Sequence, residues 1–259
     1  MNAREKLPHL FSRWDEVAGR IRKSRGVLLC LDFDGTLVRI APRPEQVHLG
    51  ARTARLLRRL GRQRKVSVML VSGRSREELR RYVCLPRVQC LGLYGWDRNG
   101  HFSLPQAEQT DLIRARLRIG EELRKFTGAW LEAKDFSLSV HVRRVERRSI
   151  PSVRRTVRGV VRPLRRSLHV FENLRDMEIA PWSVKDKGAA VRSILSESRH
   201  CDHLAFFFGD DFSDEPAFRA VRGGISVLVG KSRPSSARYR LRGPEEVTAA
   251  LARIEEAIR

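Results

Sequence analysis

Apolar positions follow two different patterns along this 259-residue chain. In the first 100 residues, a continuous apolar run at 27–31 and two mainly apolar segments at 66–71 and 89–93 alternate with amphipathic stretches at 51–64 and after Ser75. Uninterrupted apolar runs are typical of strands buried on both faces of a parallel sheet, and the amphipathic stretches predict helices. This alternation of strands and helices predicts an α/β fold with a parallel, Rossmann-like core sheet.

The pattern changes after residue 100. From Phe136 to Arg143 apolar and polar residues alternate strictly, which indicates a sheet that is covered on one side only. The surrounding segments predict helices over 111–126 and 151–166 and strands over 130–134, 168–171 and 177–180. The core pattern then resumes with a helix over 187–198 and strands over 204–208 and 225–229. We therefore expect a core domain at 1–103 and 181–259, interrupted by a smaller inserted α/β domain at 104–180.

The chain is strongly basic, with 52 lysines and arginines, 30 acidic residues and a formal net charge of +22. Such a charge suits binding to nucleic acid or to a membrane surface, but it also suits solvated faces that are rich in arginine. The arginines run from Arg4 to Arg259, and no RNA-binding signature or zinc finger accompanies them. We therefore expect no nucleic-acid or membrane partner, and a field that favours small anionic substrates.

The four cysteines, at positions 30, 84, 90 and 201, match no zinc or disulfide framework. No apolar run approaches the length of a membrane span, and the charged N-terminal stretch lacks the apolar segment of a secretory signal. These features predict a cytoplasmic protein with reduced thiols.

Chemically active residues follow the predicted core strands. Asp32 and Asp34 follow the first strand, Ser72 follows the second, Lys187 begins a helix, and Asp210 follows the strand at 204–208. Ligands of doubly wound sheets bind at the carboxyl ends of the strands. We therefore expect these side chains to meet in one crevice.

These residue types suit phosphoryl transfer. Asp32 is a carboxylate that can attack phosphorus and form an aspartyl-phosphate. Asp34 can protonate the leaving oxygen and later deprotonate water. Ser72 can donate a hydrogen bond to a phosphate oxygen, and Lys187 can neutralise charge on the nucleophile and the phosphate.

Several carboxylates beside a phosphate repel one another unless a cation lies between them. Mg²⁺ prefers a few carboxylates together with phosphate and water, so we expect Asp32, Asp210 and the backbone carbonyl of Asp34 to bind it. Gly35 permits a sharp turn, and the Thr36 region offers N–H groups and a hydroxyl to phosphate.

Each motif also has a plain structural interpretation when taken alone. The segment "DFDG" suits a turn, "GDDFSDE" suits an exposed loop with a helix cap at Ser213 or Asp214, and "DKG" suits the start of a helix. The order of the motifs and their common place at strand ends favour a catalytic site.

Four segments, "LDFDGTL", "VSGRS", "DKG" and "GDDFSDE", resemble the four motifs of the haloacid dehalogenase (HAD) superfamily of phosphotransferases. The position of the insertion resembles an α/β cap of the C2 type. This resemblance implies the catalytic roles given above. It also implies that four further residues contact phosphate or support the residues that do, namely Gly73, Arg74, Asp211 and Asp214.

Within that superfamily, "LDFDGTLVRIAPRPEQV", "LEAKDFSLSVHVRRV" and "MEIAPWSVKDKGAAV" resemble segments of trehalose-6-phosphate phosphatases. The resemblance implies Mg²⁺-dependent hydrolysis of trehalose 6-phosphate through an aspartyl-phosphate, as a step of trehalose biosynthesis. The residues it implies for sugar binding are Glu132, Lys134, His141, Arg143 and Glu178.

The sequence departs from that family at Tyr94, Val142 and Ala180, where His, Tyr and Arg are frequent. Relatives with similar caps act on sucrose 6-phosphate, mannosyl-3-phosphoglycerate or glucosylglycerol phosphate, and these substrates remain alternatives. A basic nucleic-acid-binding protein is a third hypothesis, which the intact set of catalytic residues disfavours.

Overall fold

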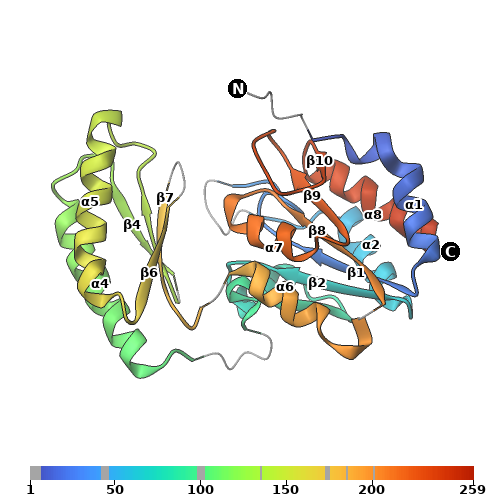
Figure 1. Ribbon diagram of the computed structural model, residues 1–259, viewed down its shortest axis with the longest axis horizontal. Helices are drawn as coiled ribbons and strands as arrows, with labels where there is room; N and C mark the ends of the chain where they lie inside the picture. The colour runs from blue at the N-terminus through green and yellow to red at the C-terminus, as the bar shows by residue number, and fades with distance from the viewer. Residues whose placement is uncertain are drawn as a thin grey trace. The chain divides into compact units, whose positions relative to one another are not determined.

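The computed structural model describes residues 7–41, 47–97, 103–134, 136–172, 176–184, 186–200 and 202–259. The chain divides into two compact units, one formed by 1–101 with 186–259 and the other by 102–185 (Figure 1). The inserted domain expected at 104–180 falls within the second unit.

The first unit is built on a six-stranded parallel sheet in the order β10-β9-β8-β1-β2-β3. Its strands are β1 (Gly26–Leu31), β2 (Val66–Val71), β3 (Val88–Leu91), β8 (His203–Gly209), β9 (Ile225–Val229) and β10 (Tyr239–Leu241). All of β1 is buried, because Leu29 and Leu31 pack on one face of the sheet and Leu28 and Cys30 on the other. The uninterrupted apolar run thus forms a strand at the centre of the sheet.

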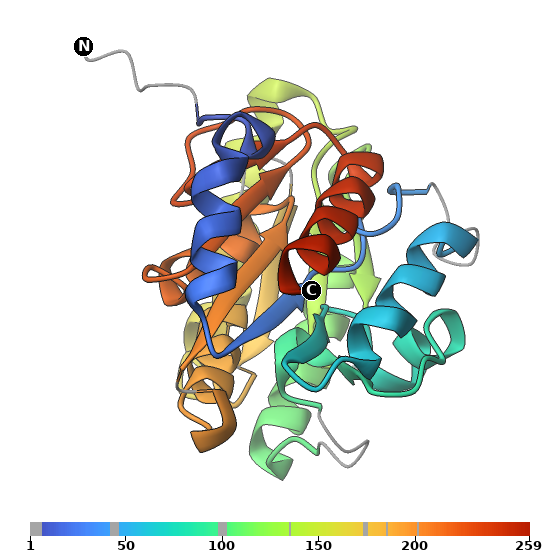
Figure 2. The ribbon, with the colours of Figure 1, turned by 90° about the vertical axis from the view of Figure 1, so that its right-hand side faces the viewer.

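Helices cover both faces of this sheet. They are α1 (Trp14–Lys23), α2 (Ala51–Arg62), α3 (Arg76–Tyr82), α6 (Lys187–Leu195), α7 (Glu215–Ala220) and α8 (Pro244–Ile258). The apolar residues of α1, α2, α3 and α8 pack on one face, and those of α6 and α7 pack on the other. Figure 2 shows α1 and α8, near the two ends of the chain, side by side on the first of these faces.

The second unit has a four-stranded antiparallel sheet in the order β4-β5-β7-β6. Its strands are β4 (Trp130–Ala133), β5 (Leu138–His141), β6 (Leu168–Glu172) and β7 (Asp176–Pro181). Helices α4 (Gln106–Leu123) and α5 (Ile150–Val161) lie on the same face of the sheet (Figure 1). A parallel core sheet joined to a smaller α/β unit confirms the predicted fold class.

One face of the second sheet packs against α4 and α5 through Leu138, Val140, Met177 and Ile179. The side chains that alternate with these residues point to the opposite face, which we call the open face. It carries Trp130, Glu132, Ser139, His141, His169, Phe171, Asp176 and Glu178. The strict alternation predicted for 136–143 is therefore observed, although β5 itself is shorter.

None of the described helices is long and apolar enough to cross a membrane. Cys30, Cys84 and Cys90 are free thiols, and Cys201 lies outside the described residues.

Candidate active site

Asp32 continues β1 by one residue. Its backbone N–H donates a hydrogen bond to the carbonyl of Phe208 on β8 (2.9 Å), and Asp32 is buried. The chain then turns sharply at Gly35, whose φ of +82° is favourable only for glycine. A Cβ at this position would clash with the Asp210 carboxylate. Gly35 thus brings the turn after β1 against the residue that follows β8.

The side chain of Lys187 joins two carboxylates in the interior. Its Nζ lies 2.6 Å from Asp32 Oδ1 and 2.7 Å from Asp214 Oδ1, and all three residues are buried. Burial alone would lower the pKa of Lys187, but the two carboxylates outweigh it and raise that pKa. Lys187 is therefore a permanent cation that holds one oxygen of Asp32 in place.

Asp210 completes a cluster of acids with these two aspartates. The carboxylate oxygens of Asp32, Asp210 and Asp214 lie within 4.8 Å of one another. Burial raises the pKa of Asp32 and of Asp210, and repulsion from the neighbouring carboxylates raises both further. One lysine does not balance three acids, so the cluster is electrostatically suited to a divalent cation.

Asp214 already uses both oxygens within the protein. Its Oδ1 accepts from Lys187, and its Oδ2 accepts from the backbone N–H of Asp211 (2.9 Å). Asp211 in turn accepts a hydrogen bond from the N–H of Phe212. Asp211 and Asp214 form the capping box of the short 3-10 turn over 212–214, with Asp211 at the cap position, whereas Asp214 makes no side-chain cap bond to α7. Asp32 and Asp210 keep carboxylate oxygens for a cation. The acids present fit a magnesium site.

Arg74 holds the side chain of Asp34. Its guanidinium donates two hydrogen bonds, from Nε to Oδ2 (2.6 Å) and from Nη2 to Oδ1 (2.8 Å). The guanidinium also lies over the rings of Tyr82 and Phe33, and these contacts keep the side chain only 12% exposed. Hydrogen bonding to Asp34 raises the pKa of Arg74. In this arrangement both carboxylate oxygens of Asp34 are used as acceptors by Arg74.

Ser72 is fixed at the end of β2 by the segment that follows β3. The backbone N–H of Tyr94 donates to the Ser72 carbonyl (2.7 Å), and that of Leu93 donates to the Arg74 carbonyl (2.8 Å). Leu93 and Tyr94 both have left-handed backbone angles, with φ of +51° and +61°. The strand predicted over 89–93 therefore ends earlier, at Leu91, because the chain must turn back to brace the Ser72 loop.

Two small residues complete this edge of the sheet. Gly73 lets the Tyr94 ring approach, since a Cβ there would lie 3.1 Å from that ring. Thr36 is fully buried, and its hydroxyl has no hydrogen-bond partner among the described residues. An orphaned hydroxyl on the residue after Gly35, which itself abuts Asp210, is consistent with a group that binds there.

The five residues predicted to contact sugar all lie on or next to the open face of the second unit. His141 is bound on both sides, by Asp176 at Nδ1 (2.7 Å) and by Glu132 at Nε2 (2.8 Å). Burial lowers the pKa of His141, but these two hydrogen bonds outweigh it and raise the pKa to about 9. The ring also stacks on Trp130, with 3.9 Å between ring centroids. His141 is therefore an imidazolium whose two N–H groups are already used.

The other predicted sugar residues also have acidic or basic partners. Lys134 Nζ lies 3.6 Å from Glu178 Oε1, which accepts a hydrogen bond from the Ser137 hydroxyl (3.0 Å). Arg143 donates to Asp176 (3.3 Å). Three residues of this network were not predicted from the sequence, namely Trp130, Ser137 and Asp176. The only signal that they share this face is the alternation of side chains along the strands, which puts every second residue of β4, β5 and β7 on the same side.

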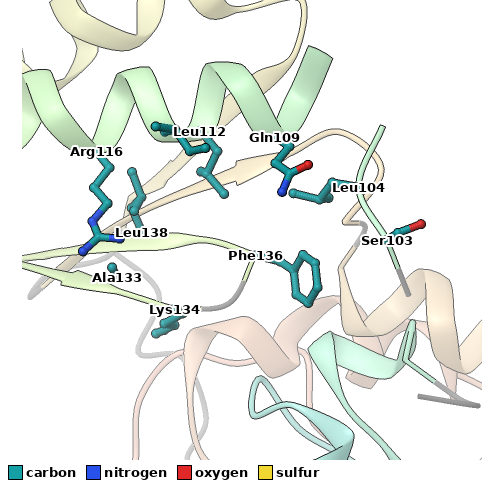
Figure 3. Close-up of a pocket in the computed structure, with 10 residues that line it drawn as sticks. Ser103, Leu104, Gln109, Leu112, Arg116, Ala133, Lys134, Phe136 and Leu138 are labelled. Carbon is teal, nitrogen blue, oxygen red and sulfur yellow. The ribbon is translucent and has the colours of Figure 1, made fainter. Parts of the chain in front are cut away.

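A cavity of about 280 Å³ lies elsewhere in the second unit, between α4 and the ends of β4 and β5 (Figure 3). Its walls are mainly apolar, from Leu104, Leu112, Phe136 and Leu138, with Lys134 at its edge. None of its described lining residues is acidic, so it is not the phosphoryl-transfer site.

Comparison with known proteins identifies the family. A family model described as trehalose-phosphatase matches residues 30–245. The chain belongs to the trehalose-phosphatase family. The matched segment includes the acid cluster, Lys187 and the second unit. The predicted family and activity, trehalose-phosphate hydrolysis by a phosphoric monoester hydrolase, are thereby confirmed, while the role of each residue remains a prediction.

Individual proteins similar to this trehalose-phosphatase support the family assignment. It is 28% identical to a probable trehalose-phosphate phosphatase 4 of Oryza sativa subsp. japonica, over 97% of this chain and 71% of that protein. The solved trehalose-6-phosphate phosphatase of Aspergillus fumigatus has the same fold, with a TM-score of 0.74, 22% identity and coverage of 97% and 99% of the two chains. A haloacid dehalogenase-like hydrolase from Bacteroides thetaiotaomicron aligns with a TM-score of 0.59, at 16% identity over 88% and 99% of the chains. These likenesses confirm the HAD-like fold.

Proposed function

We propose that this phosphatase is Mg²⁺-dependent and cleaves trehalose 6-phosphate to trehalose and phosphate through an aspartyl-phosphate at Asp32. The observation that carries the proposal is the buried Asp32–Lys187–Asp214 arrangement beside Asp210, at the carboxyl ends of β1 and β8. The names of the curated relatives support the substrate.

Asp32 is the nucleophile in this proposal. Lys187 binds Oδ1, which leaves Oδ2 to attack phosphorus and also lowers the repulsion between the carboxylate and the incoming phosphate. As the bond from Asp32 to phosphorus forms, the bond from phosphorus to the sugar oxygen breaks. Ser72, buried at the end of β2, offers its hydroxyl to a phosphoryl oxygen.

Asp34 moves the protons. It gives a proton to the departing sugar oxygen, and trehalose leaves as a neutral alcohol. The resulting carboxylate then takes a proton from water, which attacks phosphorus, releases phosphate and restores Asp32. The two hydrogen bonds from Arg74 occupy both oxygens of Asp34, so at least one of them must break before the carboxyl can carry a proton.

Asp32, Asp210 and the backbone carbonyl of Asp34 would hold the metal ion. When bound, Mg²⁺ supplies a Lewis acid that neutralises charge on the phosphoryl oxygens. Glu132, Lys134 and Glu178 would bind sugar hydroxyls through charge-assisted hydrogen bonds.

The test is phosphate release from a panel of esters, with Mg²⁺ and with excess chelator. The panel contains trehalose 6-phosphate, sucrose 6-phosphate, mannosyl-3-phosphoglycerate, glucosylglycerol phosphate, glucose 6-phosphate and p-nitrophenyl phosphate. We expect kcat/KM for trehalose 6-phosphate to exceed the others by about 100-fold and to require Mg²⁺. A higher value for another sugar phosphate would reassign the substrate, and full activity with chelator present would refute the metal requirement.

Variants test the nucleophile in the same assay. Asp32→Asn should lower kcat by about 10⁴-fold or more. Asp202→Asn is a matched control, because Asp202 is an exposed aspartate paired with an exposed arginine. Asp202→Asn should leave the kinetics unchanged.

A further inference from the structure

Three rings meet on the open face at β6, and we call them the β6 aromatic cluster: His169, Phe171 and Trp182. The imidazole lies 4.3 Å from the Phe171 ring in an edge contact and 4.4 Å from the Trp182 ring, measured between centroids. Phe171 and Trp182 are 50% and 55% exposed. The cluster therefore presents large aromatic surfaces to solvent.

The imidazole of His169 has two unused polar atoms. Both ring nitrogens are buried and have no hydrogen-bond partner among the described residues. Burial lowers the pKa of His169, so the ring is neutral and carries one donor and one acceptor. Buried polar atoms are normally paired, because leaving them unpaired is costly. A hydroxyl group can pair with either one, by accepting from the N–H or by donating to the other ring nitrogen.

The two rings around the imidazole are held differently. The indole N–H of Trp182 donates a hydrogen bond to the Arg165 carbonyl (3.0 Å), which fixes that ring. Phe171 has no polar anchor, and its side chain is half exposed. Trp182 is therefore a fixed platform, whereas Phe171 is held beside the imidazole by ring packing alone and is the ring that would move to admit a ligand.

The cluster continues the row of side chains predicted to bind sugar. In register across the sheet, Glu132 lies opposite Ser139, Ser139 opposite Glu178, and Glu178 opposite Phe171. Four adjacent strands span roughly 14 Å at their usual spacing. The row is therefore charged at the β4 edge and aromatic at the β6 edge, with Glu178 between the two halves.

We infer that the β6 aromatic cluster is a subsite for a second pyranose ring, so that the enzyme selects disaccharide phosphates over monosaccharide phosphates. The apolar C–H face of the sugar stacks on Trp182 and Phe171, and one of its hydroxyls pairs with His169. The ring at the other end of the row contacts Glu132 and Lys134. This inference rests on the proposed function and adds a specificity determinant to it.

The test compares substrates with and without a second ring. Phe171→Ala and Trp182→Ala should each raise KM for trehalose 6-phosphate about tenfold. KM for glucose 6-phosphate and p-nitrophenyl phosphate should change less than about twofold, which also shows that the variants fold. Leu117→Ala is the matched control, since Leu117 is a large, 68% exposed apolar residue on α4. Leu117→Ala should change KM for none of the three substrates.

Binding of trehalose itself gives a second measurement. Trehalose should change the tryptophan fluorescence of the whole protein, and this change should be smaller in Trp182→Phe but unaltered in Trp14→Phe. Glucose should produce a weaker change at the same concentration.

The outcomes separate this inference from the proposed function. If the wild-type enzyme does not hydrolyse trehalose 6-phosphate, the proposed function fails and the inference fails with it. If the wild type does hydrolyse it, equal losses on all substrates, or no loss on any, would overturn the subsite alone.

Discussion

His141 provides a sharp electrostatic prediction, because the structure places it between two carboxylates on the open face. Burial lowers its pKa, but hydrogen bonds with Asp176 and Glu132 raise it to about 9. The ordinary histidine pKa of 6.5 applies in the unfolded chain. Because the folded pKa is the higher one, the stabilisation by His141 is fully present below pH 6.5. It is lost as the pH rises through about 9.

The magnitude follows from that difference. A pKa raised from 6.5 to about 9 corresponds to about 3 kcal/mol at 1.36 kcal/mol per pH unit. The Glu132 side chain is 37% exposed, so solvent screens part of the attraction. We therefore expect a loss of roughly 1–2 kcal/mol in the free energy of unfolding.

The assay is urea unfolding of wild type and His141→Asn at several pH values between 6 and 10. The difference between the two chains isolates His141, because other groups titrate alike in both. We expect the difference in free energy of unfolding between wild type and His141→Asn to shrink by roughly 1–2 kcal/mol as the pH rises across this range. His48→Asn, which changes an exposed histidine, should show no such trend. A difference that stays constant with pH, or an NMR titration of His141 with a pKa at or below 6.5, would refute the reasoning.

Two further predictions concern the core. Lys187→Met leaves buried Asp32 and Asp214 without their cation, so it should lower the free energy of unfolding by about 3–5 kcal/mol. Chemical denaturation will check this, and Mg²⁺ should restore part of the loss; unchanged stability would count against the buried pair. Arg74→Ala removes the two hydrogen bonds that position the Asp34 side chain, so kcat for trehalose 6-phosphate should fall about 10–100-fold. p-Nitrophenyl phosphate, whose leaving group needs no proton, should be affected less, whereas Arg80→Ala on the exposed side of α3 should match wild type. Equal effects of Arg74→Ala on both substrates would contradict a role through Asp34.

Elements with long, clear apolar patterns were predictable from sequence. The apolar run at β1 predicted a buried core strand. The acids that follow β1 and β8 predicted the cluster of Asp32 with Asp210, because parallel strands bring their carboxyl ends to one edge. Short elements were missed. The three residues of β10 and the six of α7 are too few to show a period.

Contacts between distant residues were not predictable. Arg74 lies 40 positions from Asp34, and His141 lies 35 from Asp176. The second pairing depends on strand register, which one sequence does not specify. The left-handed turn at Tyr94 also left no signal, because turns of that kind are normally marked by glycine or asparagine.

The central claim is that Asp32 accepts the phosphoryl group, and chemical trapping tests it most directly. The enzyme is mixed with trehalose 6-phosphate and Mg²⁺, quenched in acid within one turnover, and reduced with borohydride, which converts an aspartyl-phosphate to homoserine. Peptide mass spectrometry then locates the modified residue. The account predicts homoserine at position 32, formed only with substrate and absent from Asp32→Asn. Homoserine at another aspartate, or none while phosphate is released, would contradict it.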